Sequence, residues 1–272
     1  MRTPEVSVVV PAYNAKEFII PTLESIIRQK VHRCRYEIVV VNDGSTDGTR
    51  TILHGVSSCL SGDFLRILDQ DNQGPSSAIN HGVANSRGRK IVVCDSDDML
   101  YPEAVEELCK ALNRTPFATA EKAGIRNEQF LYTSNKQGRF DQARKSDKPE
   151  NHYLFHANWV GHPIAIAIQK FEERGGFREN FWIAQDYDFC LRAIYPQAGY
   201  QDFTLLAGQV LYYHRYHLHS LSQDNRVKQL REAELAIYDT FQRIGITGVK
   251  PVAGGRDKTG LLYFSHEPQN DL

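Results

Sequence analysis

The chain has 272 residues, of which 41% are hydrophobic and 24% are charged, as in an ordinary soluble globular protein. A formal net charge of −1 and a pI near 6.8 exclude a strong overall attraction to nucleic acid or to an anionic membrane surface. The five cysteines have no Cys-x-x-Cys spacing, which argues against a zinc site, and their odd number argues against a disulfide framework. No window holds the roughly 18 apolar residues that a membrane span needs, and no signal segment precedes the first apolar run. We therefore expect a cytosolic protein, with peripheral membrane association left open.

Predicted strands and helices alternate over the first hundred residues. The predicted strands cover residues 6–10, 36–41, 64–68 and 91–94, and the predicted helices cover 17–29, 49–60 and a segment from about 75 to 84. This βαβα order is typical of an open, mostly parallel sheet with helices on both faces. A further helix is expected over 102–112, so this part of the chain predicts an α/β fold.

The pattern weakens in the second half. Residues 113–129 have no clear periodicity, residues 130–133 predict a strand, and the polar stretch 134–151 predicts a loop or a lid. Periodic structure then resumes as a strand over 163–168, a short helix ending at Gly175 and Gly176, a helix over 186–195, a strand over 210–214 and a helix over 223–243 with Val227, Leu230, Leu235 and Ile237 inward. We expect one continuous α/β unit with a more irregular second half.

Polar residues follow each predicted strand of the first half. They are Tyr13 and Asn14, Asn42 and Asp43, the residues 69–72, and the run Asp95-Ser96-Asp97-Asp98. Ligands bind at the carboxyl ends of strands in such sheets, and two carboxylates two residues apart on an extended strand point to the same side. A divalent cation is the obvious shared target. The alternative is a solvated turn in which one aspartate caps the helix near residue 102; the polar ends of the other strands favour the cation site.

Seven short motifs follow one another in order between residues 6 and 222. They are residues 8–14 (VVVPAYN), 41–49 (VNDGSTDGT), 72–82 (NQGPSSAINHG), 95–98 (DSDD), 175–177 (GGF), 185–188 (QDYD) and 213–217 (YHRYH). In this order they resemble glycosyltransferase family 2, the inverting nucleotide-sugar transferases. The resemblance implies a GT-A fold, with a mostly parallel Rossmann-like sheet. Residues 1–115 would bind the nucleotide sugar, residues 116–250 would carry the acceptor site and the base in the same domain, and residues 251–272 would form a peripheral tail.

The resemblance implies how the donor would be held. Tyr13 would stack on the nucleotide base, and Asp43 would accept the imide N–H of that base; the alternative for Tyr13 is a half-buried aromatic in a turn. Uracil and thymine carry this donor and cytosine does not, so UDP or dTDP sugars are preferred. The expected donor contacts are Pro11, Ala12, Tyr13, Asn14, Asp43, Gly74, Ser77, Asp95 and Ser96. Ile79 departs from the family, in which many members have arginine, so contacts of this helix with the diphosphate stay open.

The resemblance also implies Mn²⁺ or Mg²⁺ beside the diphosphate. Asp97 would ligate the cation, and Asp95 would contact the ribose or the metal. The part played by Asp98 stays open because relatives differ in which carboxylate of this DXD-type cluster binds the metal. His217 is either a further ligand, which would favour Mn²⁺, or a structural histidine at a strand end.

By the same resemblance, Asp186 is expected to be the general base. It would take the proton of the acceptor hydroxyl during an attack opposite the leaving group, which inverts the anomeric carbon. The family often has Glu-Asp where this chain has Gln185 and Asp186, so Gln185 is an acceptor contact at most, and Asp188 is expected to make structural bonds. Residues expected to line an acceptor pocket are Trp159, Gly161, His162, Pro163 and Trp182, although buried tryptophan is commoner as plain core.

The sequence thus predicts a metal-dependent inverting glycosyltransferase that moves a sugar from a UDP-type donor to a hydroxyl of a glycan or a lipid-linked sugar. A nucleotidyltransferase is one alternative, but it would be expected to have a glycine-rich, basic phosphate loop after the first strand, where this chain has Pro-Ala-Tyr-Asn. The other alternative is a non-catalytic sugar-nucleotide or glycan-binding module on the same fold, which would tolerate loss of Asp186.

Overall fold

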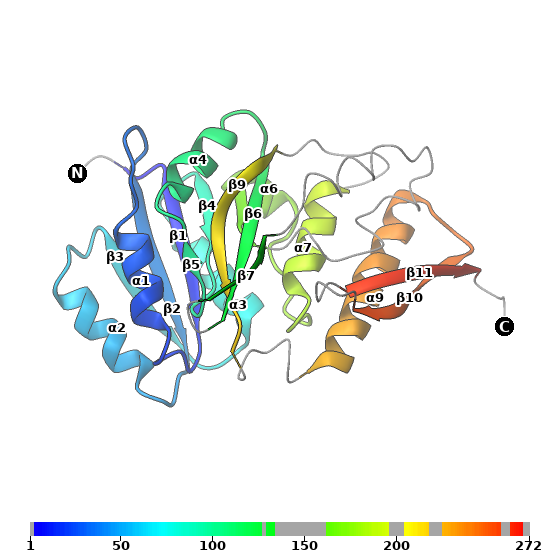
Figure 1. Ribbon diagram of the computed structural model, residues 1–272, viewed down its shortest axis with the longest axis horizontal. Coiled ribbons are helices and arrows are strands. Elements are labelled where there is room, and N and C mark those ends of the chain that lie inside the picture. The colour runs from blue at the N-terminus through cyan, green and yellow to red at the C-terminus, as the bar shows by residue number, and fades with distance from the viewer. Residues whose placement is uncertain are drawn as a thin grey trace.

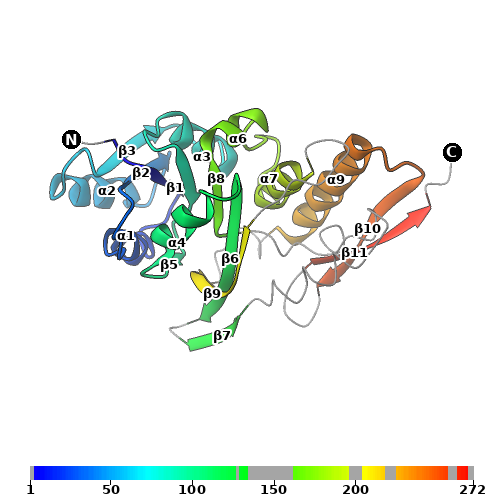
Figure 2. The ribbon, with the colours of Figure 1, turned by 90° about the horizontal axis from the view of Figure 1, so that it is seen from above.

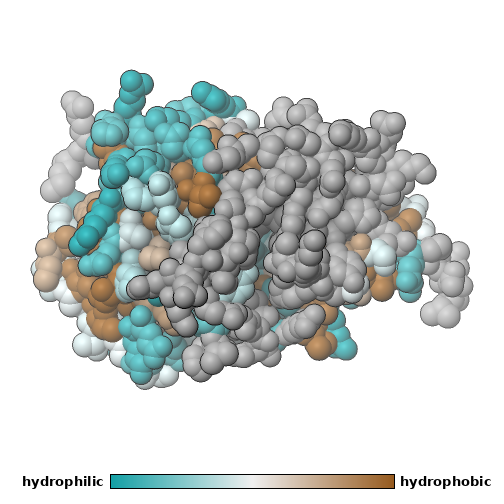
Figure 3. Space-filling view, in the orientation of Figure 1, coloured by the Kyte–Doolittle hydropathy of each residue, from teal (hydrophilic) through white to brown (hydrophobic). Residues whose placement is uncertain are grey.

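The computed structural model describes residues 3–126, 129–133, 162–195, 204–217, 225–256 and 262–268. These residues form a large mixed sheet with helices on both faces and a C-terminal hairpin beside the last helix (Figure 1). The expected loop or lid at 134–151, and the expected pocket residues Trp159 and Gly161, lie outside the described residues. Hydrophilic and hydrophobic residues are interspersed over the described part of the face in Figure 3, as on most protein surfaces.

The first four strands form the parallel half of the sheet. They are β1 (Val6–Ala12), β2 (Tyr36–Asp43), β3 (Leu65–Gln70) and β4 (Lys90–Val93), in the order β3-β2-β1-β4. Val9 of β1 lies on one face of the sheet, whereas Val8 and Val10 lie on the other, and all three are fully buried. Their continuous apolar run is therefore explained by helices on both sides of a central strand, as predicted.

Helices α1 (Ile19–Ile27), α2 (Thr49–Ser58) and α4 (Ala104–Ala111) cover one face, and α3 (Pro75–Ala84) covers the other. Pro21 lies in the first turn of α1, where the missing backbone N–H costs nothing. Gly82 allows α3 to approach the sheet closely, because a Cβ at this position would lie 2.5 Å from the Cγ1 of Val9. The parallel sheet expected for this half is confirmed.

The second half of the sheet is mixed. It adds β5 (Met99–Leu100), β6 (Phe117–Arg126), β7 (Gln129–Thr133), β8 (Ile164–Ala167) and β9 (Thr204–Arg215). From β4 the order continues as β8-β6-β9-β5 with β7 beside β6, and among these pairs only β6 and β9 are parallel. Residues 113–129, whose sequence has no clear periodicity, contain β6. Residues 117–120 are buried without alternation because both faces of β6 are covered.

Three helices and a hairpin follow the sheet on its far side. They are α6 (Ile168–Glu173), α7 (Gln185–Ile194), α9 (Arg226–Ile244), β10 (Val249–Arg256) and β11 (Leu262–Pro268). In Figure 2, α7, α9 and the hairpin succeed one another away from the sheet. In α9 the inward prediction holds for Ile237, which is buried, but was wrong for Val227 and Leu235, which are 65% and 44% exposed. Phe264 of β11 is buried in the core beside Tyr187, so this part of the expected peripheral tail is packed.

Among the described residues, no helix has the length and the apolar character needed to cross a membrane.

Candidate active site

The strand ends of the parallel half gather most of the predicted donor contacts. Pro11 and Ala12 end β1, Tyr13 and Asn14 follow it, Asp43 ends β2, Gly74 and Ser77 begin α3, and Asp95 and Ser96 follow β4. The turn after β1 is fixed because the Asn14 Oδ1 accepts the backbone N–H of Thr46 at 2.8 Å. The backbone N–H of Lys16 likewise donates to the Oδ2 of Asp47. This turn leaves Tyr13 48% exposed, so an aromatic face is open at the edge of the sheet.

Asp43 organises the loop that leads into α3. Its Oδ1 accepts hydrogen bonds from Gln70 Nε2 at 2.8 Å and from the backbone N–H of Gln73 at 2.9 Å. Its Oδ2 accepts the backbone N–H of Gly74 at 2.9 Å. A carboxylate has about four acceptor positions, so the described residues leave one position, on Oδ2. His81 in turn lies 2.7 Å from Gln70 Oε1 and fixes the orientation of that amide.

Three aspartates after β4 form a carboxylate cluster. One side-chain oxygen from each of Asp95, Asp97 and Asp98 lies within 4.8 Å of the others, an arrangement that could hold a metal ion. The segment after β9 meets this cluster, since His217 Nε2 lies 2.8 Å from Asp97 Oδ2. The His217 ring also packs on Phe18, with 4.3 Å between ring centroids. Residues more than a hundred positions apart therefore meet at one edge of the sheet.

Asp98 is bound differently from its neighbours. It is 1% exposed, its Oδ1 accepts the backbone N–H of Arg215 at 2.8 Å, and its Oδ2 lies 3.2 Å from His214 Nδ1. Burial alone would raise the pKa of Asp98, but His214 and the N–H of Arg215 hold the pKa below its usual range. Both oxygens of Asp98 therefore connect the segment between β4 and β5 to β9.

Asp95 lies among like charges. Burial raises the pKa of Asp95 well above its usual range, and the charges of Asp98, Asp97 and Asp186 raise it further. A cation could reach Asp95, because 35% of its side chain is still exposed to solvent. Such a cation would remove the effect of the like charge on the pKa of Asp95. Its Oδ2 lies 3.4 Å from the Nδ1 of His162. Burial lowers the pKa of His162 to about 4, so this imidazole is neutral at pH 7.

Asp186 is the second residue of α7, and its Oδ1 accepts the backbone N–H of Tyr187 at 2.7 Å. Its charge acts on both Asp95 and His162, so the candidate base and the carboxylate cluster belong to one electrostatic site. α7 comes from the second half of the chain and the cluster from the first. The role of Asp186 as base stays a prediction, and its charge acts on Asp95 of the cluster.

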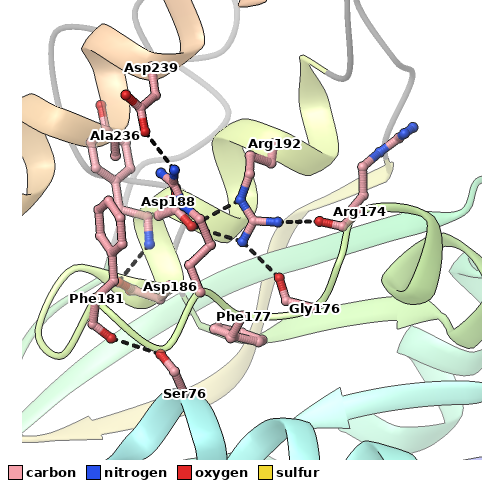
Figure 4. A network of polar contacts seen from close by, with 12 residues as sticks. Ser76, Arg174, Gly176, Phe177, Phe181, Asp186, Asp188, Arg192, Ala236 and Asp239 are labelled. Atoms are coloured by element: carbon pink, nitrogen blue, oxygen red, sulfur yellow. Dashed lines mark hydrogen bonds and ion pairs between the residues drawn. The ribbon is translucent and has the colours of Figure 1, made fainter.

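Asp188 lies two residues after Asp186 in α7 and is 1% exposed. It pairs with Arg178 and with Arg192, whose Nη2 also donates to the carbonyl oxygen of Gly176 at 2.8 Å. Figure 4 shows the Arg192 guanidinium between Asp188 and the segment at Gly176. The structural role predicted for Asp188 is confirmed, because its Oδ1 binds Arg178 of the loop before α7 and its Oδ2 binds Arg192 of α7 itself, which donates to that loop.

Trp182 and Glu232 complete this side of the site. The Trp182 ring is 39% exposed and lies against Gly74, where a Cβ would come within 3.2 Å of the ring. Glu232 of α9 accepts the backbone N–H groups of residues 182–184. The sequence analysis missed Glu232, since a single glutamate within an amphipathic helix carries no motif.

Comparison with known proteins gives the family. Residues 7–171 match the profile of the family described as Glycosyl transferase family 2. The putative glycosyltransferase EpsH of Bacillus subtilis is 28% identical over 260 residues, which cover 88% of this chain and 69% of EpsH. The chondroitin synthase of Escherichia coli is 40% identical over 204 residues, which cover 70% of this chain and 26% of that protein. The chain thus spans about a quarter to two thirds of the length of these curated relatives.

Solved structures share the fold. The TarS protein of S. aureus, residues 1–349 in complex with UDP-GlcNAc, has a TM-score of 0.65 at 18% identity, covering 90% of this chain and 72% of that one. The mannosyltransferase PcManGT of Pyrobaculum calidifontis, in complex with GDP-Man and Mn²⁺, also has a TM-score of 0.65, at 19% identity, covering 89% and 65%. The GT-A fold expected from the sequence is confirmed. Because the matched profile spans more than half of the residues, the chain belongs to glycosyl transferase family 2 and is an enzyme of the glycosyltransferase class.

Proposed function

We propose that this chain transfers a sugar from a UDP-type nucleotide sugar to a hydroxyl acceptor, with inversion at the anomeric carbon. The observation that carries the proposal is the pairing of the cluster Asp95, Asp97 and Asp98 with Asp186 in one electrostatic site. The complex of TarS with UDP-GlcNAc supports a UDP sugar as donor. The names of two relatives, chondroitin synthase and hyaluronan synthase, favour a glycan hydroxyl as acceptor.

Asp43 and Tyr13 suit a base with an imide N–H. The one acceptor position that the chain leaves on Asp43 Oδ2 can take that N–H, and the exposed Tyr13 ring can stack on the base. The remaining hydrogen bonds of Asp43 hold its carboxylate in place before the donor binds. dTDP sugars would meet the same two side chains, so the donor test includes them.

The residues at the cluster fit a divalent cation. Asp97 Oδ2 and His217 Nε2 lie 2.8 Å apart, and adjacent ligands of an octahedral Mg²⁺ lie about 3 Å apart because each bond is about 2.1 Å. We assign Asp97 and His217 as ligands with Asp95 beside them, and we assign Asp98 to the connection with β9. An imidazole ligand favours Mn²⁺ over Mg²⁺. When bound, the cation would stabilise the negative charge of the departing diphosphate.

Asp186 takes the proton of the acceptor. Its carboxylate accepts the hydroxyl proton while the acceptor oxygen forms a bond to the anomeric carbon from the face opposite the leaving group. The bond from that carbon to the β-phosphate oxygen breaks, and its electron pair leaves with UDP. The neutral His162 contacts Asp95 without adding positive charge to the site. A single displacement of this kind inverts the configuration.

The test measures nucleotide release from UDP-GlcNAc, UDP-glucose, UDP-glucuronic acid, dTDP-glucose and GDP-mannose, with Mn²⁺, Mg²⁺ or chelator. We expect release from a UDP sugar that needs the metal and is lost in Asp97→Ala, with the exposed Glu24→Ala as the unaffected control. Asp186→Asn is expected to bind UDP as the wild type does but to release almost none from the sugar donor.

Four results would contradict the proposal. Undiminished turnover in chelator removes the metal role, and a wild-type rate in Asp186→Asn removes the base. Binding of nucleotide sugars without any turnover would favour a non-catalytic binding module. A product that keeps the anomeric configuration of the donor would exclude the single displacement.

A further inference from the structure

A carboxylate of α9 binds the segment that leads into α7. Glu232 Oε2 accepts the backbone N–H groups of Trp182 at 3.0 Å, Ile183 at 2.8 Å and Ala184 at 3.0 Å. The Glu232 side chain is buried, with 8% of the residue exposed. One oxygen therefore fixes three consecutive peptide groups that lie 48 to 50 positions away in the chain.

These three N–H groups immediately precede α7 and share Glu232 Oε2 as their acceptor. α7 begins at Gln185, and its N-cap residue Ala184 has no side chain that could cap the helix. Consecutive N–H groups that converge on one point form a site for an anion, and hydrogen bonds to a carboxylate are about twice as strong as neutral ones. Glu232 supplies that anion from within the chain, immediately before the turn that carries Asp186.

A second residue of α9 holds the side chain of the same segment. Lys228 lies one helical turn before Glu232, and its Nζ is 5.1 Å from the centroid of the Trp182 ring and 3.9 Å from Glu232 Oε1. The ring also contacts the α-carbon region of Gly74, the residue whose N–H binds Asp43. The segment 182–184 is thus attached to α9 by its backbone and is in contact with the donor-side loop through its ring.

We propose that Glu232 is a positioning residue for glycosyl transfer: by holding the N–H groups of Trp182, Ile183 and Ala184 it sets the place of Asp186 against the donor. The inference rests on the proposed role of Asp186 as base. Glu232 is buried and would act through the segment 182–184, to which it is hydrogen-bonded. Its effect follows from geometry, because a misplacement of a reacting group by about 1 Å can lower a rate about 100-fold.

Two substitutions separate the charge of Glu232 from its geometry. Glu232→Gln keeps an oxygen that can accept the same N–H groups, whereas Glu232→Ala leaves the three groups without an acceptor. The matched control is Glu234→Ala, because Glu234 lies on the same helix and its Oε1 accepts the backbone N–H of Ala253 at 2.6 Å, away from residues 182–184. Both glutamates thus bind backbone through a carboxylate, but Glu232 alone of the two binds the segment before α7.

The experiment measures Mn²⁺-dependent UDP release from the UDP sugar that the wild type uses best, with water as acceptor. We expect kcat of Glu232→Ala to fall at least about tenfold, while the KM for the UDP sugar and the stoichiometry and Kd of UDP binding stay as in the wild type. Glu232→Gln should recover most of kcat, and Glu234→Ala should keep it. In a Trp159→Phe background, which leaves Trp182 as the single tryptophan, Glu232→Ala should expose Trp182 to acrylamide quenching and Glu234→Ala should not.

The outcomes distinguish this inference from the function on which it rests. If Asp186→Asn abolishes release but Glu232→Ala keeps the wild-type kcat, the positioning role is overturned alone. Equal losses of kcat in Glu232→Ala and Glu234→Ala also overturn it, since they indicate a general effect on the fold. Wild-type release in Asp186→Asn, or no release from any nucleotide sugar by the wild type, overturns the proposed function and this inference with it.

Discussion

Replacement of Gly74 by alanine tests how the donor side of the site is built. Gly74 is the N-cap of α3 with φ 90° and ψ 167°, a conformation that is essentially restricted to glycine. Its N–H donates to Asp43 Oδ2 at 2.9 Å. An added Cβ would lie 3.2 Å from the nearest atoms of the Trp182 ring. Alanine here therefore strains the backbone and presses on the ring at the same time.

The size of the effect follows from these two contributions. Holding a non-glycine residue in this region costs about 1–3 kcal/mol. The ring contact adds less than a buried clash would, because Trp182 is 39% exposed and can move. We expect the free energy of unfolding to fall by about 2–3 kcal/mol. If the loop relaxes instead, its N–H leaves Asp43, and the affinity for UDP falls about tenfold, which corresponds to about 1.4 kcal/mol.

The assays are urea denaturation and calorimetric titration of UDP in the presence of Mn²⁺. Gly245→Ala is the matched control, because Gly245 ends α9 with φ 80° and no atom within 4 Å of an added Cβ. It should lose about 1–2 kcal/mol of stability from the left-handed backbone and bind UDP as the wild type does. The reasoning is refuted if Gly74→Ala binds UDP normally and is no less stable than Gly245→Ala.

Two further predictions concern carboxylates that hold the fold. Glu37 is fully buried and paired with Arg66 and Arg87, so Glu37→Gln should lower the free energy of unfolding in urea by about 3–5 kcal/mol; a loss below 1 kcal/mol would contradict this assignment. For Glu106, burial raises the pKa, but the N–H groups of residues 32–34 lower it to about 2. Because the folded pKa lies below the ordinary glutamate value of 4.5, this stability is present above about pH 4.5 and is lost as the pH falls toward 2. The full pKa shift corresponds to about 3 kcal/mol, and the long bonds of 3.1–3.4 Å reduce our expectation to about 2 kcal/mol. The deficit of Glu106→Gln relative to the wild type, measured at pH 6, should therefore shrink at pH 3, and an equal deficit at both values would show that the carboxylate charge plays no part.

The sequence predicts the parallel half of the fold because local pattern and tertiary position agree there. The apolar run of β1 is buried on both faces, and Pro21 sits where a helix tolerates it. Residues 117–120 of β6 are also buried on both faces, but the sequence FATAEKAGIR mixes small and charged residues and so has neither an apolar run nor the alternation that marks a strand. In α9, Val227 and Leu235 are apolar but exposed, because the face of a long helix is set by what packs on it and not by composition alone.

The candidate site is predictable where it depends on strand ends and motifs. Asp97 and Asp186 are found from the order of short motifs, and the structure places both near Asp95. The sequence predicted neither the hydrogen bonds of Glu232 to residues 182–184 nor the contact of His162 with Asp95. Their partners lie about 50 and 67 positions away in the chain, and no periodicity encodes a contact between a carboxylate and distant backbone N–H groups.

The partners of each carboxylate decide which of them a cation can bind. Both oxygens of Asp98 and of Asp188 already accept hydrogen bonds or ion pairs from the chain, so a cation there would displace contacts that hold β9 and α7. Asp95 differs from these two residues. Burial and like charge raise its pKa, and 35% of its side chain is exposed to solvent. Asp97 meets His217 through one oxygen. A cation held by Asp97 and His217 with Asp95 beside it would therefore relieve repulsion without breaking the fold, which is why we propose the site there and not at Asp98.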